Sequence, residues 1–119
     1  MNTTRQRQAA GLSRWGRALA IPVCAAIALA SYAGAASTTH VVEIEAMKFA
    51  PAKLEVKAGD TVTWRNKDPF PHTATAEQKG FDSGNLEADR SWSFKTRDKG
   101  VFPYVCSLHP GMKGVLVVR

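Results

Sequence analysis

Hydrophobic and polar residues alternate in short segments from Val41 to the end of the chain. Alternation with a period of two predicts half-buried β-strands. We expect strands, or pairs of strands joined by a turn, at "VVEIEAM" (41–47), "KLEVKAGDTVTWRN" (53–66, with a turn at 58–60), "HTATA" (72–76), "SWSFKT" (91–96), "GVFPYVC" (100–106) and "GVLVV" (114–118). Glycines separate several of these segments, and no helical period is long enough to bury an apolar stripe.

This pattern predicts an all-β fold, an antiparallel β-sandwich or barrel. The segment "EQKGFDSGNLEA" (77–88) is expected to be a long connection with room for one short strand. Four aromatic residues are expected to form the core: Trp64, Trp92, Phe94 and Phe102.

The first third of the chain has a different composition. Residues 1–17 contain four arginines and no acidic residue, residues 18–30 are apolar, and small residues follow, including Ala33-Gly34-Ala35. This order is typical of a secretory signal peptide that ends in an A-x-A cleavage site. We therefore expect a signal peptide at 1–36, a domain at 37–119 and a periplasmic location.

An uncleaved membrane anchor is the alternative. The apolar segment is rich in alanine, is interrupted by Pro22, and is shorter than the ~20 residues that a membrane-spanning helix needs. Cys24 lacks the small preceding residues of a lipoprotein acceptor, because Pro22 and Val23 stand there. We expect no membrane insertion of the domain at 37–119.

Charge and cysteine content change once the leader is set aside. Four of the sixteen basic residues lie in residues 1–17, which leaves twelve basic and ten acidic residues, a net charge of +2 instead of +6. These charges are interspersed and form no basic stripe, so we expect no nucleic-acid partner. The domain has one cysteine, Cys106, which cannot form an internal disulfide. Small exported domains commonly need a disulfide or a metal for stability, and the single thiol favours a metal.

The thiol belongs to a cluster of metal-binding residue types. Cys106, His109 and Met112 are separated by two residues each, with Pro110-Gly111 expected to form a turn. A C-x2-H step places both side chains on one tight turn, whose end Cα atoms lie within about 7 Å. His72 is the source of a second imidazole. Two histidines, one cysteine and an axial methionine are the ligand set of a type 1 copper site. We predict one Cu(I)/Cu(II) ion per chain, bound by His72, Cys106, His109 and Met112.

Each of these residues alone has a simpler explanation. Cys106 can be a small buried hydrophobic residue, His72 a hydrogen-bonded histidine at a strand end, and Met112 core filler. Zinc sites prefer cysteine, histidine and carboxylate, so a thioether adds little to them. With four protein ligands no position stays open for a substrate, which argues against metal-assisted catalysis.

Three segments resemble the plastocyanin/azurin family of small cupredoxins. They are "FAPAKLEVKAGDTVTWRNKDPFPHTATA" (49–76), "FDSG" (81–84) and "GVFPYVCSLHPGMKGVLVV" (100–118), and the resemblance covers nearly all of the chain from Val41 onward. The two-residue gap between the second histidine and the methionine is similar to that of amicyanin. The resemblance implies an eight-stranded Greek-key sandwich with copper near one end, and it carries the ligand roles onto the same four side chains.

In this family the loop histidine reaches the surface through an apolar patch. The resemblance places His109 in a partner-docking patch formed by Phe70, Pro71, Leu108 and Pro110, with Met47 and Phe49 nearby. Three lysines, Lys48, Lys67 and Lys113, are expected to form a basic rim that steers an acidic partner. Solvated lysines without that role are the alternative.

The chain departs from the family at three positions beside the ligands. Val105 stands where plant plastocyanins have a tyrosine, so we expect no remote electron path there. Thr73 stands where asparagine is frequent, and we expect its N–H to reach the thiol of Cys106. Leu108 stands where amicyanins have proline. Since proline has no N–H, Leu108 is expected to donate an additional hydrogen bond to the same sulfur.

These predictions favour a periplasmic one-electron carrier between redox proteins, with a dehydrogenase or cytochrome as donor and a cytochrome or oxidase as acceptor. A copper carrier or copper-resistance protein with the same fold is the alternative. We expect a monomer and no enzyme activity, because three histidines cannot build further copper sites. His40 is expected in a flexible terminus, and a Cu(II) site formed with a free amino group at Thr38 is the other possibility.

Overall fold

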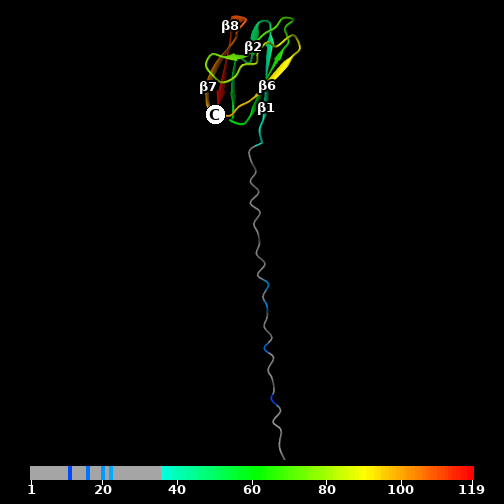
Figure 1. The fold of residues 1–119 in the computed structure, drawn as a ribbon, viewed down its shortest axis with the longest axis vertical. Coiled ribbons are helices and arrows are strands. Elements are labelled where there is room, and N and C mark those ends of the chain that lie inside the picture. The colour runs from blue at the N-terminus through cyan, green and yellow to red at the C-terminus, as the bar shows by residue number, and fades with distance from the viewer. Residues whose placement is uncertain (1–10, 12–15, 17–19, 21, 23–35) are drawn as a thin grey trace, which may run out of the picture. The chain divides into compact units, whose positions relative to one another are not determined.

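The structure is a computed structural model that describes residues 36–119 together with Gly11, Gly16, Ala20 and Pro22 (Figure 1). Most of the predicted signal peptide at 1–36, including Cys24, lies outside the described residues. The strands described below belong to the unit Ala33–Arg119. Among the described residues, no helix has the length and apolar character needed to cross a membrane.

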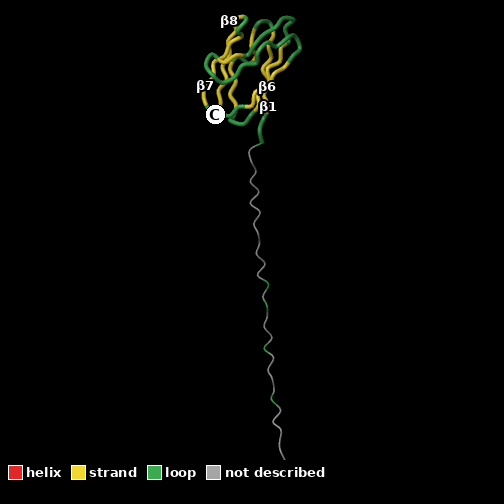
Figure 2. The backbone as a smooth tube through the Cα atoms, in the orientation of Figure 1, coloured by secondary structure: helices red, strands yellow, loops and turns green. Residues whose placement is uncertain are grey.

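The regular secondary structure of the described residues consists of strands, as Figure 2 shows. The eight strands are β1 (Thr39–Glu45), β2 (Lys48–Ala50), β3 (Lys53–Val56), β4 (Thr61–Asn66), β5 (Thr75–Ala76), β6 (Ser91–Lys95), β7 (Gly100–Cys106) and β8 (His109–Val118). They form two four-stranded sheets, ordered β2-β1-β4-β6 and β3-β8-β7-β5. The all-β prediction and the strand number implied by the family resemblance are confirmed.

The expectation of purely antiparallel pairing is wrong at two places. β1 pairs with β4 in parallel, with Val42 opposite Trp64, and β3 pairs with β8 in parallel, with Leu54 opposite Leu116. Between β2 and β4 the chain crosses to the second sheet as β3, so β4 returns beside β1 without a hairpin. The side-chain period of two is the same in both kinds of sheet. The sequence pattern therefore predicts the strands but not their direction.

The core lies between the two sheets. Trp64 of β4 is fully buried, and its ring lies 5.5 Å from that of Tyr104 of β7 and 5.1 Å from that of Phe81. Phe81 belongs to the connection at 77–88, which contains no strand, only isolated bridges, and covers the core with its apolar residues. Of the predicted core aromatics, only Trp64 is fully buried; three pack against the core from partly buried positions, namely Trp92, Phe94 and Phe102.

His40 is held in the sheet, so the prediction of a flexible terminus is wrong. It lies in β1, and its Nε2 is 3.0 Å from Oδ2 of Asp60. The buried Asp60 carboxylate also accepts hydrogen bonds from the N–H groups of Thr38 and Lys57. These bonds, led by that from Thr38 and followed by those from His40 and Lys57, lower the pKa of Asp60 to about 2. The Thr38 N–H and Nε2 of His40 are thus both bonded to Asp60.

Asp60 makes the stability of the domain depend on pH. Asp60→Asn is expected to melt at a lower temperature than the parent protein at pH 7, because one amide oxygen cannot replace two carboxylate oxygens. The pKa of the folded carboxyl is about 2, against an ordinary 3.8. The stabilisation is therefore complete above about pH 4 and is lost as the pH falls toward 2. Melting curves followed by circular dichroism should show that the difference in melting temperature between Asp60→Asn and the parent protein becomes smaller from pH 7 to pH 2.5.

The matched control is Asp98→Asn, because the Asp98 side chain is 75% exposed and pairs with the exposed Arg97. It should melt close to the parent protein across the whole series. If Asp60→Asn lowered the melting temperature by the same amount at pH 7 and at pH 2.5, the ionised Asp60 carboxylate would not be the source of the stabilisation.

Candidate metal centre

Three of the predicted donors converge on one point of the domain. Sγ of Cys106 lies 3.7 Å from Nδ1 of His72 and 3.7 Å from Nδ1 of His109, and all three donor atoms lie within 4.8 Å of one another. His72 and Cys106 are fully buried, whereas His109 is partly exposed. Among the residues the structure describes, this is the one group of three potential metal donors of this kind.

The turn between β7 and β8 positions two of the donors. Cys106 is the last residue of β7 and His109 the first of β8, and the two residues are paired across a connection of only Ser107 and Leu108. A connection this short brings the ends of both strands together. The tight turn predicted from the C-x2-H spacing is present.

His72 reaches the centre from a separate segment of the chain. It lies before β5, and β5 pairs with β7 so that Thr75 is opposite Val105. The backbone of His72 exchanges two hydrogen bonds with Leu86, of 3.0 Å and 2.7 Å. These pairings fix the imidazole beside the Cys106 thiol, 34 residues away along the chain.

Met112 lies in β8 and belongs to the same buried cluster as Cys106, with only 5% of its surface exposed. Val105 pairs with Lys113, yet the next pair is Cys106 with His109, so β8 carries three extra residues there. Pro110 and Gly111 therefore lie in an irregular part of the strand instead of the turn expected from their sequence. The irregularity leaves Met112 as the one buried residue of that insertion.

A carboxylate orients the His72 ring. Oδ2 of Asp68 lies 2.8 Å from Nε2 of His72, and a carboxylate can only accept. Nε2 thus carries the hydrogen, and Nδ1 presents a lone pair toward Cys106. Burial raises the pKa of Asp68, but hydrogen bonds from Met47 N–H, His72 and Ala46 N–H outweigh it and lower that pKa below its ordinary value.

A backbone amide points at the thiol. Thr73 N–H donates to Sγ of Cys106 over 3.3 Å, as the sequence predicted. The second bond expected, from Leu108 N–H, is absent from the hydrogen bonds of the described residues; the Leu108 side chain is 46% exposed. This bond holds the sulfur beside the two imidazoles.

This donor set fits a transition-metal ion. An oriented imidazole, a second imidazole and a buried thiol bring their donor atoms within 4.8 Å of one another, and the sulfur accepts a backbone N–H. Soft sulfur with imidazole nitrogen suits copper in both common oxidation states. The residues present thus match the group predicted from the sequence.

The family described as a cupredoxin-like domain matches residues 17–118. The chain is a cupredoxin. Amicyanin-alpha of Methylorubrum extorquens is 33% identical over 100 residues, which cover 80% of this chain and 84% of that protein. A solved variant of amicyanin with Cu(I) has a TM-score of 0.65 and 30% identity, and covers 68% of this chain and 82% of its own.

A larger enzyme shares the same domain. A copper-containing nitrite reductase from Thermus scotoductus matches 68% of this cupredoxin with a TM-score of 0.64 and 28% identity. The match spans only 22% of the reductase chain, so the similarity concerns one domain of that enzyme.

The predicted docking residues lie on the surface near the donors. Phe70 and Leu108 are 44% and 46% exposed, Pro110 is exposed, and Pro71 is partly buried. Phe70 also contacts the centre, since its ring lies 5.6 Å from that of His72. Of the two neighbours expected, Met47 is exposed, but Phe49 is buried, with 4% of its surface exposed. The ring centre of Phe49 lies 4.7 Å from that of Tyr104 in the core.

The rim lysines differ in their surroundings. Lys67 forms an ion pair of 2.8 Å with Glu43, which reduces its positive charge as seen by a partner. Lys48 and Lys113 are exposed, and no ion pair of the described residues involves them. Of the three lysines expected at the rim, these two are thus the ones without an ion pair among the described residues.

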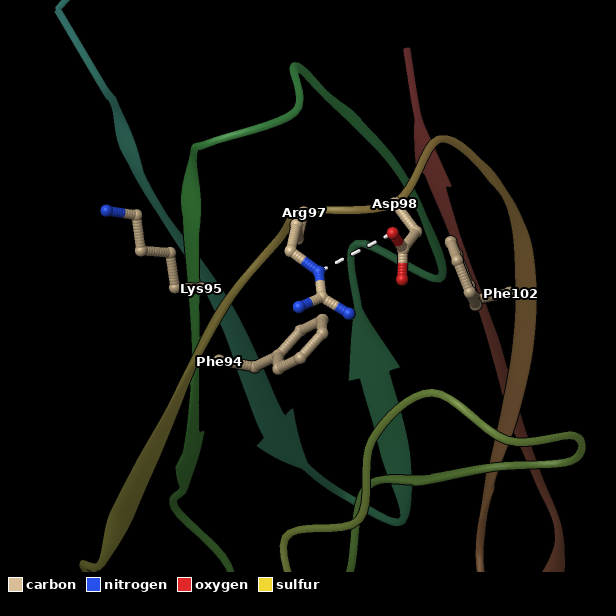
Figure 3. A pocket seen from close by; sticks show the side chains of 5 residues that line it. All are labelled: Phe94, Lys95, Arg97, Asp98 and Phe102. Carbon is tan, nitrogen blue, oxygen red and sulfur yellow. Dashed lines mark ion pairs between the residues drawn. The ribbon is translucent and has the colours of Figure 1, made fainter.

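A surface pocket elsewhere on the domain has no part in the centre. Its lining residues are Phe94, Lys95, Arg97, Asp98 and Phe102, shown in Figure 3. Arg97 and Asp98 form an exposed ion pair of 3.5 Å, and none of the five is among the predicted ligands.

Sequence reasoning missed Asp68, which orients His72. The available signal is weak: Asp68 precedes His72 by four residues in "DPFPH", a segment that both prolines mark as a loop. An acidic residue at this distance can fold back onto the imidazole, but the sequence does not say that it does.

Proposed function

We propose that this cupredoxin is a one-electron carrier that holds a single copper ion with His72, Cys106, His109 and Met112. The observation that carries the proposal is the convergence of Cys106 Sγ with two imidazole Nδ1 atoms, each 3.7 Å away. When bound, copper supplies the redox change, cycling between Cu(I) and Cu(II). Met112 would be the fourth residue that holds copper, supported by its burial in the same cluster as Cys106.

The protein frame suits rapid electron exchange. The thiol and one imidazole are fully buried, and the strands that carry them are joined by the β5–β7 and β7–β8 pairings. Asp68 fixes the ring of His72, and Thr73 N–H fixes the thiol. Because these contacts restrain the ligands in place, little reorganisation is needed when the charge of the site changes.

Electrons are exchanged through the apolar patch of Phe70, Pro71, Leu108 and Pro110. Leu108 and Pro110 flank the partly exposed His109 in the sequence, and the ring of Phe70 lies 5.6 Å from that of His72. Small interfaces of this kind serve weak redox encounters. The partners are redox proteins, a dehydrogenase or cytochrome as donor and a cytochrome or oxidase as acceptor. Lys48 and Lys113 favour partners with an acidic surface.

Leu108→Glu tests the patch without any knowledge of the natural partner. It should slow electron self-exchange between the Cu(I) and Cu(II) forms about tenfold, because two patches that carry like charges repel each other. Self-exchange is measured by NMR line broadening, and the visible spectrum should stay unchanged. Val101→Glu is the matched control: Val101 is 65% exposed and lies near the other end of β7, about 16 Å from Cys106. Equal slowing in both variants would contradict the assignment of the patch.

An electron carrier and a copper carrier differ in what happens to the metal. The copper-loaded protein should be bleached by one equivalent of a reduced cytochrome and recover its colour on reoxidation, with copper retained through gel filtration. Loss of copper on reduction, or its transfer to a second protein, would favour the copper-carrier function. A carrier is also favoured over an enzyme, because the described residues offer one converging donor group and the third histidine, His40, is bonded to Asp60.

The carrier works in the periplasm as a monomer, after removal of the segment at 1–36. This part of the proposal depends on the arginines and apolar residues of the leader. Cell fractionation with the mass of the exported protein tests it: a product that begins near residue 37 supports it, and a full-length, membrane-bound product contradicts it.

A further inference from the structure

A chain of hydrogen-bonded side chains runs from the loop beside the donors to the protein surface. Oγ of Ser107 lies 3.0 Å from Oγ1 of Thr73, which lies 2.9 Å from Oγ1 of Thr75. The Thr75 hydroxyl donates to Oδ1 of Asp82 over 3.0 Å. The chain thus links the connection between Cys106 and His109 to the segment that follows His72, and neither segment is adjacent to the other in sequence.

The acceptor at the surface end sets the direction of every bond in this chain. A carboxylate has no hydrogen to give, so Thr75 donates its only hydroxyl hydrogen to Asp82. Thr75 must then accept from Thr73, and Thr73 in turn must accept from the Ser107 hydroxyl. Ser107 N–H also donates to Oγ1 of Thr73 over 2.8 Å. Both lone pairs of Thr73 are therefore used by Ser107.

We propose that Asp82, Thr75 and Thr73 act as positioning residues that clamp Ser107, and with it the Cys106–His109 turn, against the segment carrying His72. The consequence for the centre is direct, since the same Thr73 donates its N–H to Cys106 Sγ. The benefit of the clamp to a copper site rests on the proposed function, but the hydrogen bonds that form the clamp need no copper. Among the hydrogen bonds of the described residues, none joins the side chain of Asp82, Thr75 or Thr73 to a metal donor.

Asp82 acts as an acceptor, and its charge is not required. Gly84 N–H donates to the same Oδ1 atom over 2.9 Å that receives the Thr75 hydroxyl. In Asp82→Asn the Gly84 amide would hold the side-chain oxygen in that place and leave the direction of the chain unchanged. In Asp82→Ala no acceptor remains, so Thr75 can donate to Thr73 instead and compete with Ser107 for its lone pairs.

Amide hydrogen exchange measured by NMR tests the clamp on the full exported protein, reduced so that any bound copper is diamagnetic. Exchange of the Ser107 amide should be about tenfold faster in Thr75→Val and in Asp82→Ala, and nearly unchanged in Asp82→Asn. The isosteric Thr73→Val should accelerate it further, and adding Thr75→Val to Thr73→Val should have no additional effect. The exchange rate of the Val62 amide, in β4, is the control: it should rise only in a variant that has lost global stability.

Two results would overturn the clamp. One is an unchanged Ser107 amide in Thr75→Val and Asp82→Ala while Val62 keeps its protection. The other is Asp82→Asn behaving like Asp82→Ala, which would show that the acceptor argument is wrong. The copper hyperfine splitting reports whether the clamp affects the metal site, and it should shift in Thr73→Val. If the protein bound no copper, the proposed function would fail, yet the exchange rates would still decide the clamp.

Discussion

Cys106→Ser is expected to abolish the intense visible absorption of the copper-loaded protein. That absorption arises from charge transfer between a thiolate and copper, and Sγ of Cys106 is the thiol atom between the two imidazoles. Since loss of even an outer partner of a ligand weakens metal binding about 10- to 100-fold, loss of this ligand should weaken Cu(II) binding by more than about 100-fold. Visible and electron paramagnetic resonance spectra measure the first effect, and titration against a copper chelator measures the second.

The control for this variant is a histidine outside the cluster. His40→Gln removes an imidazole that is bonded to Asp60, and it should keep both the colour and the affinity. A coloured Cys106→Ser protein would contradict the assignment of the thiolate. Loss of colour in His40→Gln would show that copper is held elsewhere.

Asp68→Asn should have the second largest effect on copper binding. The carboxylate accepts from Nε2 of His72 over 2.8 Å and so leaves Nδ1 free for the metal. An amide has one acceptor oxygen for the donors of Ala46, Met47 and His72, so at least one donor would face an N–H group. We expect Cu(II) affinity to fall about 10- to 100-fold. The ring should also become less basic, which disfavours Cu(II) and raises the reduction potential.

Chelator competition and voltammetry measure these two effects, with Asp98→Asn as the control for loss of an acidic residue. Asp98 is exposed and pairs with Arg97 away from the donors, so its variant should match the parent protein. An Asp68→Asn protein with parental affinity and potential would show that the carboxylate does not orient the ligand.

Most of the strands were predictable from the sequence because their residues alternate between a more buried and a more exposed face, but β2 was not predicted. Alternation in segments such as 41–47 indicates that face and located strands in both sheets, although β1 ends at Glu45, and Ala46 and Met47 form a turn. Strand direction was not predictable, since β3 crosses between sheets and nothing in the side-chain period records this. Phe81 was missed as a core residue because it lies in a connection, where no periodicity marks the side that packs on Trp64.

The candidate donors were predictable to different degrees. Cys106 and His109 lie on one short turn, so their convergence follows from local spacing. His72 was proposed by its residue type and by the resemblance, and the structure brings it beside the thiol through the β5–β7 pairing. The contacts of Asp68 and Ser107 depend on tertiary structure, since each joins segments whose approach is decided by the whole fold.

The most direct measurement of the central claim is the electron paramagnetic resonance spectrum of the exported protein with one equivalent of Cu(II), recorded together with its visible absorption. The account predicts an intensely coloured protein with the narrow hyperfine splitting of a copper–thiolate centre, both lost on reduction and regained on oxidation. A colourless protein with the wide splitting of copper bound only by nitrogen and oxygen would contradict it.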